Sequence, residues 1–183
     1  MPDESSIASI VPWAEQLGER VRRLGFGLIC TAESCTGGLI AAALTETPGS
    51  SAWFGRGYVT YANRAKVDML GVSPADLQIH GAVSEVVARQ MALGALADED
   101  GFLSLAVTGI AGPGGGQIGK PVGTVCFGWA LRWPMQPGAP LVSSETRHFQ
   151  GERRAIRHQT AAYALARALQ VLDRQNADRP LIG

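Results

Sequence analysis

The stretch "TAESCTGGLIAAAL", Thr31–Leu44, joins a run typical of a buried strand to an apolar run typical of a helix. A carboxylate, hydroxyls and a thiol come directly before the two glycines at the joint. In α/β folds such turns lie at the carboxyl ends of strands, where ligands bind, and the first amides of the new helix favour anions. The stretch therefore predicts an α/β domain with a ligand site at this turn.

The rest of the chain alternates between helical and extended patterns. Apolar residues recur at three- and four-residue steps from Ile10 to Leu24, and similar spacing predicts helices over 84–98 and 152–172. Branched and aromatic content predicts strands, which are "FGLICTAE", "GYVTY", "FLSLAVTG", "VGTVCFGWAL" and "LVSSETRHF". This alternation predicts a single three-layer α/β/α domain with a mixed sheet over residues 1–183, with a core of about 10–173.

Charge and hydropathy exclude two classes of partner. The sixteen basic and sixteen acidic side chains cancel and are dispersed, so no basic stripe offers the affinity that nucleic-acid binders use. The start, "MPDESSIASIVPWAEQL", lacks the basic and apolar regions of a secretory signal, and no apolar run reaches membrane-spanning length. We expect a cytoplasmic protein with neither nucleic acid nor a membrane as its partner.

The cysteines and histidines predict neither a disulfide nor a metal site. Three cysteines form an odd and sparse set, which a reducing compartment would keep as thiols. None of the three histidines forms a pair with metal-ligand spacing to a cysteine. We therefore expect no metal ion and no cofactor.

The glycine-rich segment "GGGQIGK", Gly114–Lys120, matches the spacing of a phosphate-binding P-loop without its chemistry. Position 121 is proline, where a P-loop has serine or threonine to hold magnesium. A P-loop also runs directly into a helix, whereas "PVGTVCFGWAL" is rich in strand formers. A surface loop is the expected structure, and its glycines would let the backbone approach a ligand closely.

Lysine is rare in this chain, and its positions suggest a base. Fourteen of the sixteen basic residues are arginine, and the only lysines are Lys66 and Lys120. Arginine cannot lose its proton near neutral pH, whereas a desolvated lysine can, which makes lysine a usable base for a serine nucleophile. Chance in an arginine-rich chain is the alternative explanation, and the residues alone leave both open.

The segment before Lys66 contains partners for such a base. In "TPGSSAWFGRGYVTYANRAK", Ser51 and Tyr61 precede Lys66, and a Ser/Lys pair assisted by a tyrosine is a recognised amide-hydrolysing site. A straight strand from Ser51 to Tyr61 would separate them by about 33 Å. Either the chain reverses at Gly55 and Gly57, or a neighbouring subunit completes the site. A Ser51 that only caps a helix is the alternative.

Cys35 is a rival nucleophile. Its position near a predicted helix N-terminus would lower its pKa. No sequence feature identifies a partner base, and a buried thiol with no catalytic role is the commoner outcome. A Cys35-dependent amidase therefore stays open at this point.

Six segments together resemble a known family. They are "TAESCTGG", "PGSSAWFGRGYVTYANRAK", "GAVSE", "AVTGIAGPGGG", "KPVGTV" and "GERRAIRHQTAAYAL". In this order they resemble the C-terminal domain of the CinA family, the competence/damage-inducible proteins, in its stand-alone form. The resemblance runs from about Trp13 to Leu172. It implies a metal-independent amidohydrolase that converts nicotinamide mononucleotide to nicotinate mononucleotide and ammonia.

The resemblance also implies roles for individual residues. Ser51 corresponds to the nucleophile, Lys66 to its base and Tyr61 to an assisting phenol. The residues expected to line the substrate pocket are Ser34, Thr108, Gly109 and Arg153. Two departures keep the chemistry: Thr108 replaces a frequent serine, and Glu152 replaces a frequent aspartate.

The resemblance and the turn together predict how a nucleotide binds. We expect "ESCTGG" to present Ser34, Thr36 and the amides of Gly37 and Gly38 toward either the phosphate or the oxyanion of the reaction. A small-molecule substrate and a homo-oligomer are expected. A non-catalytic nucleotide-binding module is the alternative from a different class.

Overall fold

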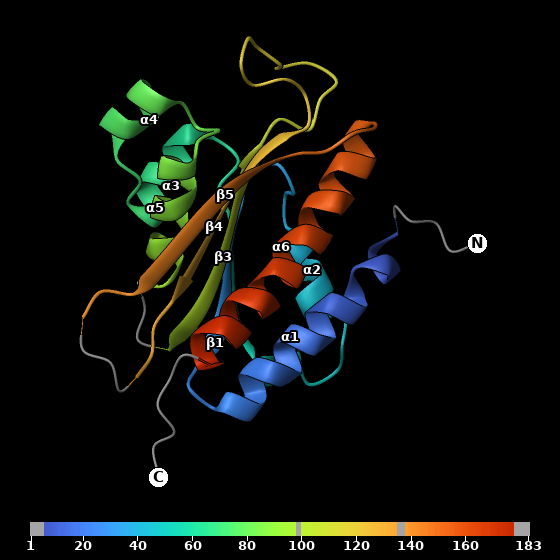
Figure 1. Ribbon diagram of the computed structural model, residues 1–183, viewed down its shortest axis with the longest axis vertical. Coiled ribbons are helices and arrows are strands. Elements are labelled where there is room, and N and C mark those ends of the chain that lie inside the picture. Colours follow the sequence, from blue (N-terminus) through green and yellow to red (C-terminus); the bar gives the residue numbers. More distant parts are fainter. Residues whose placement is uncertain (1–5, 98–99, 135–137, 178–183) are drawn as a thin grey trace.

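The structure is a computed structural model that describes residues 6–97, 100–134 and 138–177 (Figure 1). Five strands form one sheet in the order β2-β1-β3-β4-β5. Their bounds are β1 Leu28–Glu33, β2 Phe54–Val59, β3 Gly101–Gly109, β4 Thr124–Leu131 and β5 Leu141–His148. β1 runs parallel to β2 and β3, whereas β4 runs antiparallel to β3 and β5. The predicted mixed sheet is confirmed.

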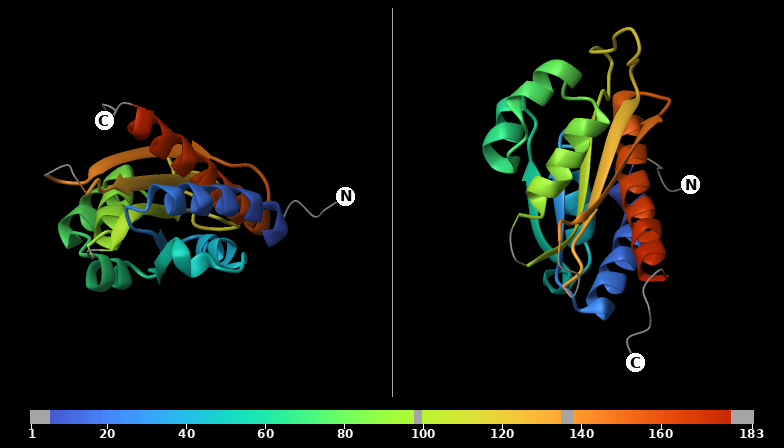
Figure 2. Two further views of the ribbon diagram at one scale, coloured as in Figure 1. Left: turned by 90° about the horizontal axis from the view of Figure 1, so that it is seen from below. Right: turned by 60° about the vertical axis from the view of Figure 1, so that its left-hand side comes forward.

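Helices cover both faces of this sheet (Figure 2). One layer contains α1 Val11–Leu24, α2 Leu39–Thr45 and α6 Arg153–Ala177. The opposite layer contains α3 Asn63–Leu70, α4 Pro74–His80 and α5 Glu85–Ala95. Two short 3₁₀ helices, η1 Ile7–Ser9 and η2 Ser50–Ala52, complete the described elements. The three-layer α/β/α architecture is therefore confirmed.

The two layers pack differently against the sheet. Large side chains such as Phe127 and Trp129 fill the side of α1 and α6, and the Trp129 indole donates to the Ala164 carbonyl at 3.1 Å. On the α5 side the strands carry smaller residues, and a Cβ on Gly128 would lie 2.3 Å from the Ala88 carbonyl oxygen. Because both faces are covered, β3 and β4 are buried along nearly their whole length.

Most elements lie where the periodicity predicts them, and α4 is the helix that the patterns did not predict. Its start carries a recognisable signal, because Ser73 caps the helix by accepting from the Asp76 amide, and Pro74 occupies the first helical position. The glycine-rich segment leads into β4, as its composition predicts, and not into a helix. Lys120 in this segment donates to the His80 carbonyl at 2.8 Å.

The connections of the sheet create a switch point between β1 and β3. The chain leaves β1 through α2 on one face and returns from β2 to β3 through α3, α4 and α5 on the other. Ligands of open α/β sheets bind at the carboxyl ends of strands, where the connections diverge in this way. The carboxyl edge of β1, β2 and β3 is therefore where the site is expected.

Candidate active site

A small pocket of about 220 Å³ opens at this edge. Segments that follow all three parallel strands contribute to it. Its lining residues are Ser34, Cys35, Tyr61, Asn63, Lys66, Ala82, Val83, Thr108, Gly109, Ala111 and Arg153. The fold thus brings together seven of the residues that the sequence pointed to, which are Ser34, Cys35, Tyr61, Lys66, Thr108, Gly109 and Arg153.

Ser34 and Lys66 meet in this pocket. Ser34 directly follows β1, and its amide donates to the Val107 carbonyl of β3 at 3.0 Å, which fixes its backbone. Lys66 extends from α3, and its Nζ lies 3.1 Å from the Ser34 Oγ. A serine hydroxyl in hydrogen-bond contact with an amine is the geometry of an activated nucleophile.

The surroundings of Lys66 suit a neutral amine. The side chain is 1% exposed, and burial lowers its pKa below the ordinary lysine value, although the nearby Cys35 sulfur opposes this effect. Its Nζ donates to the carbonyls of Thr60 at 2.8 Å and Tyr61 at 3.4 Å. The same Nζ donates to the Ser34 Oγ at 3.1 Å; once the amine is neutral, its two N–H donors serve the carbonyls and its lone pair accepts from the Ser34 hydroxyl.

Ser51 lies at the opposite end of β2 from Lys66. Ser51 is exposed within η2, before the strand begins, whereas Tyr61 and Lys66 follow the strand's carboxyl end. Six strand residues span about 20 Å. Gly55 and Gly57 lie inside β2 and do not reverse the chain. The expected Ser51–Lys66 pairing is therefore not formed within one chain, and the serine that contacts Lys66 is Ser34.

The Tyr61 phenol does not take the expected place beside the nucleophile. Its side chain is 60% exposed, and its hydroxyl accepts from the Arg153 guanidinium at 2.8 Å. Tyr61 contacts Lys66 through its backbone carbonyl instead. The residue lines the pocket, but among the described contacts its phenol bonds Arg153 and not Lys66 or Ser34.

The turn after Ser34 is organised by the buried carboxylate of Glu33. This side chain is fully buried, and its oxygens accept from the amides of Gly38 and Ile40 at 3.0 Å and of Ala41 at 2.8 Å. A carboxylate at a helix N-terminus satisfies unpaired amides and complements the helix dipole. The Glu33 carboxylate thus takes the place at the start of α2 where an anionic ligand would bind.

This arrangement corrects the role expected for the two glycines. The Gly38 amide donates to Glu33, and the Gly37 amide donates to the Ser34 carbonyl at 3.1 Å. Neither amide is available to a phosphate. Both glycines have positive φ angles, 61° for Gly37 and 95° for Gly38, a conformation that glycine adopts without steric cost. They shape the turn, and both amides already have acceptors within the protein.

Thr36 is also turned away from the pocket. It is fully buried, does not line the cavity, and its hydroxyl has no hydrogen-bond partner among the described residues. Its carbonyl accepts from the Arg157 guanidinium at 2.6 Å, and the Cys35 carbonyl accepts from the same group at 3.1 Å. Arg157 of α6 therefore holds the backbone of Cys35 and Thr36 through these two hydrogen bonds.

Cys35 lies beside the pocket as a protonated thiol. Burial raises its pKa to about 12, and the nearby Glu33 carboxylate acts in the same direction. A thiol with this pKa is a poor nucleophile near neutral pH. The helix N-terminus does not lower the pKa as expected, because Glu33 already caps it.

The end of β3 supplies the opposite wall. The Thr108 hydroxyl is buried and donates to the Ala82 carbonyl at 2.9 Å, so it holds the "GAVSE" segment against the sheet. A Cβ on Gly109 would lie 2.7 Å from the Val125 side chain, which leaves no room for a larger residue. Asn63 also lines this pocket, although the sequence analysis did not name it.

A larger pocket of about 710 Å³ adjoins the first and shares Ala111 and Arg153 with it. Its remaining lining residues are Pro113, Val122, Gly151, Glu152, Arg154 and Arg157. Arg153 lies between the two pockets, where its guanidinium donates to the Gly112 carbonyl and to the Tyr61 hydroxyl, both at 2.8 Å.

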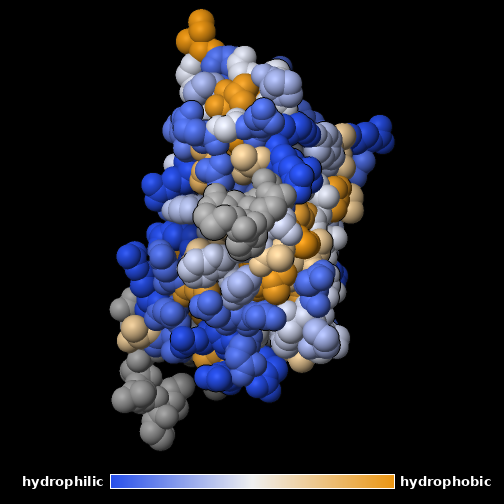
Figure 3. All heavy atoms as spheres, turned by 90° about the vertical axis from the view of Figure 1, so that its right-hand side faces the viewer, coloured by the Kyte–Doolittle hydropathy of each residue, from blue (hydrophilic) through white to orange (hydrophobic). Residues whose placement is uncertain are grey.

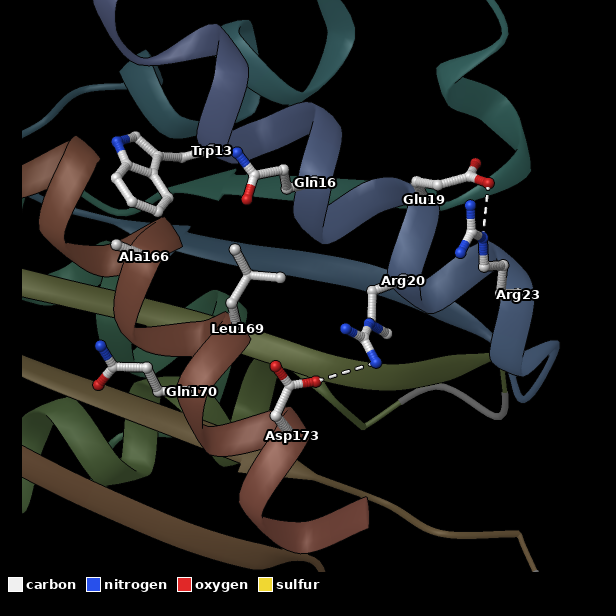
Figure 4. A pocket seen from close by; sticks show the side chains of 9 residues that line it. All are labelled: Trp13, Gln16, Glu19, Arg20, Arg23, Ala166, Leu169, Gln170 and Asp173. Atoms are coloured by element: carbon white, nitrogen blue, oxygen red, sulfur yellow. Dashed lines mark hydrogen bonds and ion pairs between the residues drawn. The ribbon is translucent and has the colours of Figure 1, made fainter. Parts of the chain in front are cut away.

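A third hollow, of about 390 Å³, lies between α1 and α6 (Figure 4). Its charged groups pair with each other: Arg20 contacts Asp173 at 3.2 Å, and Arg23 contacts Glu19 at 2.9 Å. The residues that line it include no serine, cysteine or lysine. This hollow therefore offers no nucleophile for amide chemistry, in contrast to the pocket of Ser34 and Lys66.

The face on the side of α1, α2 and α6 is mostly hydrophilic, with small hydrophobic patches between polar residues (Figure 3). Within residues 6–97, 100–134 and 138–177, no helix is both long and apolar enough to cross a membrane. In the same ranges no three His, Cys, Asp or Glu side chains are grouped so that they could hold a metal ion.

Sequence reasoning missed Glu33 and Arg157 as site residues. The carboxylate stands directly before Ser34 in "TAESCTGG", but which amides it accepts from depends on the packed turn. Arg157 is 122 positions from Cys35, and only the packing of α6 beside α2 brings the two together. The arginine-rich start of the last helix, "RRAIR", is the sequence feature that points to such a contact.

Comparisons with known proteins show the family of this chain. The family model described as CinA C-terminal domain matches residues 12–172. The chain is 48% identical over 154 residues to a protein of Enterobacter agglomerans named nicotinamide-nucleotide amidohydrolase PncC. This match covers 84% of this chain and 90% of that protein. It is 54% identical over 141 residues to a putative competence-damage inducible protein of Symbiobacterium thermophilum. That match covers 75% of this chain and spans only 33% of the longer relative.

A solved structure shows the same fold. The competence/damage inducible protein CihA of Agrobacterium tumefaciens superposes with a TM-score of 0.80 at 44% identity, over 94% of this chain and 98% of that one. The matched region contains the whole Ser34–Lys66 pocket, since the family model spans every residue that lines it. The chain belongs to the CinA C-terminal domain family.

Proposed function

We propose that this protein is a nicotinamide-nucleotide amidase that hydrolyses the carboxamide of nicotinamide mononucleotide with Ser34 as nucleophile and Lys66 as base. The contact between the Lys66 Nζ and the Ser34 Oγ at 3.1 Å is the observation that carries this proposal. Relatives named nicotinamide-nucleotide amidohydrolase support the substrate, at 45 to 48% identity over most of the chain.

The reaction would begin with a proton transfer inside the pair. Neutral Lys66 accepts the Ser34 hydroxyl proton while Oγ attacks the carboxamide carbon, which forms a tetrahedral intermediate. The protonated amine then gives this proton to the leaving nitrogen, and ammonia departs as the C–N bond breaks. Lys66 next removes a proton from water, which attacks the acyl-enzyme and releases nicotinate mononucleotide. Each proton that Lys66 takes is returned, so the cycle needs no metal ion.

The developing negative charge needs a donor near Ser34. Within the turn, the amides of Ser34, Gly37 and Gly38 already donate to protein oxygens. The Cys35 amide has no acceptor in the hydrogen bonds of the described residues, and Cys35 lines the pocket. We assign the oxyanion to this amide, since a preorganised backbone donor beside the nucleophile stabilises such a charge.

An ammonia-release assay tests the reaction and the substrate together. Nicotinamide mononucleotide should release ammonia and nicotinate mononucleotide, whereas free nicotinamide should react far more slowly. Ser34→Ala protein, with its fold verified by circular dichroism, is the control for background hydrolysis. Thermal stabilisation by the nucleotide without any ammonia would instead indicate a non-catalytic binding module.

A further inference from the structure

Lys120 is the second of the two lysines in this chain, and it takes no part in the Ser34–Lys66 chemistry. It ends the segment "GGGQIGK", and its Nζ donates to the His80 carbonyl at 2.8 Å. His80 is the last residue of α4, where backbone carbonyls lack partners within the helix and the helix dipole favours a cation. The ammonium group lies close to Gly81, since a Cβ added there would be 3.7 Å from the Nζ. Lys120 therefore joins the glycine-rich segment to the end of α4.

This contact lies next to one wall of the catalytic pocket. Ala82 and Val83 line that pocket, and they come directly after the end of α4 and its capping glycine. The Ala82 carbonyl accepts from the Thr108 hydroxyl at 2.9 Å, so two side chains from distant parts of the chain hold the same short segment. A shift of this segment would change the shape of a pocket of only about 220 Å³.

The other side of the contact is the tip of the loop that connects β3 to β4. This loop rises above the sheet at the end of the molecule where α4 lies (Figure 1). Gln117 and Lys120 exchange two backbone hydrogen bonds, of 3.0 and 2.9 Å, which close the tip as a hairpin. Ile118 at this tip is fully exposed, so the tip does not pack against the protein through it. Among the described residues, the hydrogen bonds that join 113–120 to other elements come from the Lys120 side chain.

The start of the same loop lies against the catalytic pocket from another side. Ala111 lines this pocket, and the carbonyl of the following Gly112 accepts from the Arg153 guanidinium at 2.8 Å. The loop is thus held at its start by Arg153 and at its tip by Lys120. Because the tip is tied to the residue that precedes the Ala82 segment, Lys120 connects two walls of the catalytic pocket.

We infer that Lys120 is a positioning residue for amide hydrolysis, which holds the wall formed by Ala82 and Val83 in place against the glycine-rich loop. The inference rests on the proposed amidase function. An aromatic carboxamide needs an apolar surface beside its ring, and these two side chains provide one in the pocket of Ser34 and Lys66. Lys120 itself does not line that pocket, so it acts on substrate binding through the wall and not on the proton transfer.

Steady-state ammonia release from nicotinamide mononucleotide is the first test. Lys120→Met keeps the length of the side chain without its donor. It should raise KM about 3- to 10-fold and leave kcat within about twofold, because binding is weakened while the Ser34–Lys66 pair is intact. Lys120→Arg keeps the charge and N–H donors, so its KM should stay within about twofold of wild type. Gln117→Ala is the matched control, since Gln117 is exposed on the same tip and bonds through its backbone.

Hydrogen exchange measures the contact without any turnover. The Gly81 amide donates to the Leu77 carbonyl at 3.0 Å, so the end of α4 has a protected amide beside the Lys120 contact. Exchange in this segment should be about threefold or more faster in Lys120→Met than in wild type, and unchanged in Gln117→Ala. Peptides from α1 and α6, in the opposite layer, should exchange as in wild type. Thermal midpoints should stay within about 3 °C of wild type, because a surface contact adds little to global stability.

The two tests separate the possible failures. If Lys120→Met and Gln117→Ala have the same KM and the same exchange, the positioning role is overturned while the amidase stands. A Lys120→Arg enzyme as impaired as Lys120→Met would also overturn it, because the lost hydrogen bond would not be the cause. A large loss of kcat with unchanged KM would place Lys120 in the chemical step instead. If the wild type releases no ammonia but exchange at the end of α4 still depends on Lys120, the amidase fails and the contact between loop and wall stands.

Discussion

The Nζ of Lys66 lies 3.1 Å from the Oγ of Ser34 although 32 residues separate them in the chain. The contact forms because β1 and β2 are adjacent and parallel, so the segments after both strands leave the sheet at the same edge. Ser51 is closer to Lys66 in sequence, but it precedes β2 and lies at the other edge. The five predictions below follow from this geometry.

Ser34→Ala should lower kcat by about a thousandfold or more, because the attacking atom is lost, whereas Ser51→Ala should change kcat less than about twofold. Ser51 is exposed in η2, so its substitution should also leave the stability within about 0.5 kcal/mol of wild type. Steady-state ammonia release by the two purified variants measures the difference. A large loss in Ser51→Ala with little in Ser34→Ala would show that a second subunit supplies the nucleophile.

Lys66→Arg should fail nearly as badly as Lys66→Ala. Arginine keeps the positive charge, but its pKa above about 12 prevents it from accepting the Ser34 proton. A Lys66→Arg enzyme that retains more than about one-tenth of wild-type kcat, a loss below roughly 1.4 kcal/mol in barrier, would contradict the base role. The measurement is kcat at saturating substrate, with thermal unfolding to verify the fold.

The pH dependence of kcat/KM should report the Lys66 amine. A base must be neutral before it accepts a proton, so the rate should rise with pH and level off above the Lys66 pKa. Because burial lowers this pKa, the plateau should begin below about 10.4, the ordinary lysine value. The pH profile of the wild type should show this rise, and the profile of the residual activity of Lys66→Ala should lack it. A rate that instead falls as pH increases from about 6 to 9 would identify a protonated group as essential.

Cys35→Ala should retain at least about one-tenth of the activity. The thiol pKa of about 12 lies four units above pH 8, so on the order of one molecule in 10⁴ carries the thiolate there. The Cys35 amide, which the mechanism uses, remains in the alanine variant. Inactivation by iodoacetamide at pH 8 should accordingly be slow. A loss above a thousandfold in Cys35→Ala would support the cysteine-dependent amidase instead.

Glu33→Gln should destabilise the fold by about 1 to 3 kcal/mol. The buried carboxylate accepts from three amides, and a carboxamide can present only one acceptor oxygen, which leaves at least one N–H without a partner. Urea unfolding of wild type and variant measures the loss. Glu46→Gln, on the exposed cap of the same helix, is the control and should change the midpoint little. Equal midpoints for Glu33→Gln and wild type would refute the capping role.

The sequence by itself determined the local elements and the chemistry of individual side chains. The spacing of apolar residues predicts α1, α5 and α6. The buried face of a helix repeats with a fixed period along the chain, so a local stretch of sequence is enough to detect it. The rarity of lysine marked Lys66 and Lys120 as candidate bases, since this step needed only their side-chain chemistry. The α/β/α layering followed from the alternation of strands and helices along the chain.

The tertiary structure alone decided which groups meet. Strand order places Ser34 and not Ser51 beside Lys66, and packing of α6 beside α2 brings Arg157 to the turn. The sequence could not show that the Glu33 carboxylate takes the amides at the start of α2, because a hydrogen-bond acceptor is chosen by three-dimensional proximity. Periodic patterns depend on residues that are near neighbours in the chain. The Ser34–Lys66 contact instead joins two segments that are distant in sequence, and only the folded sheet brings them together.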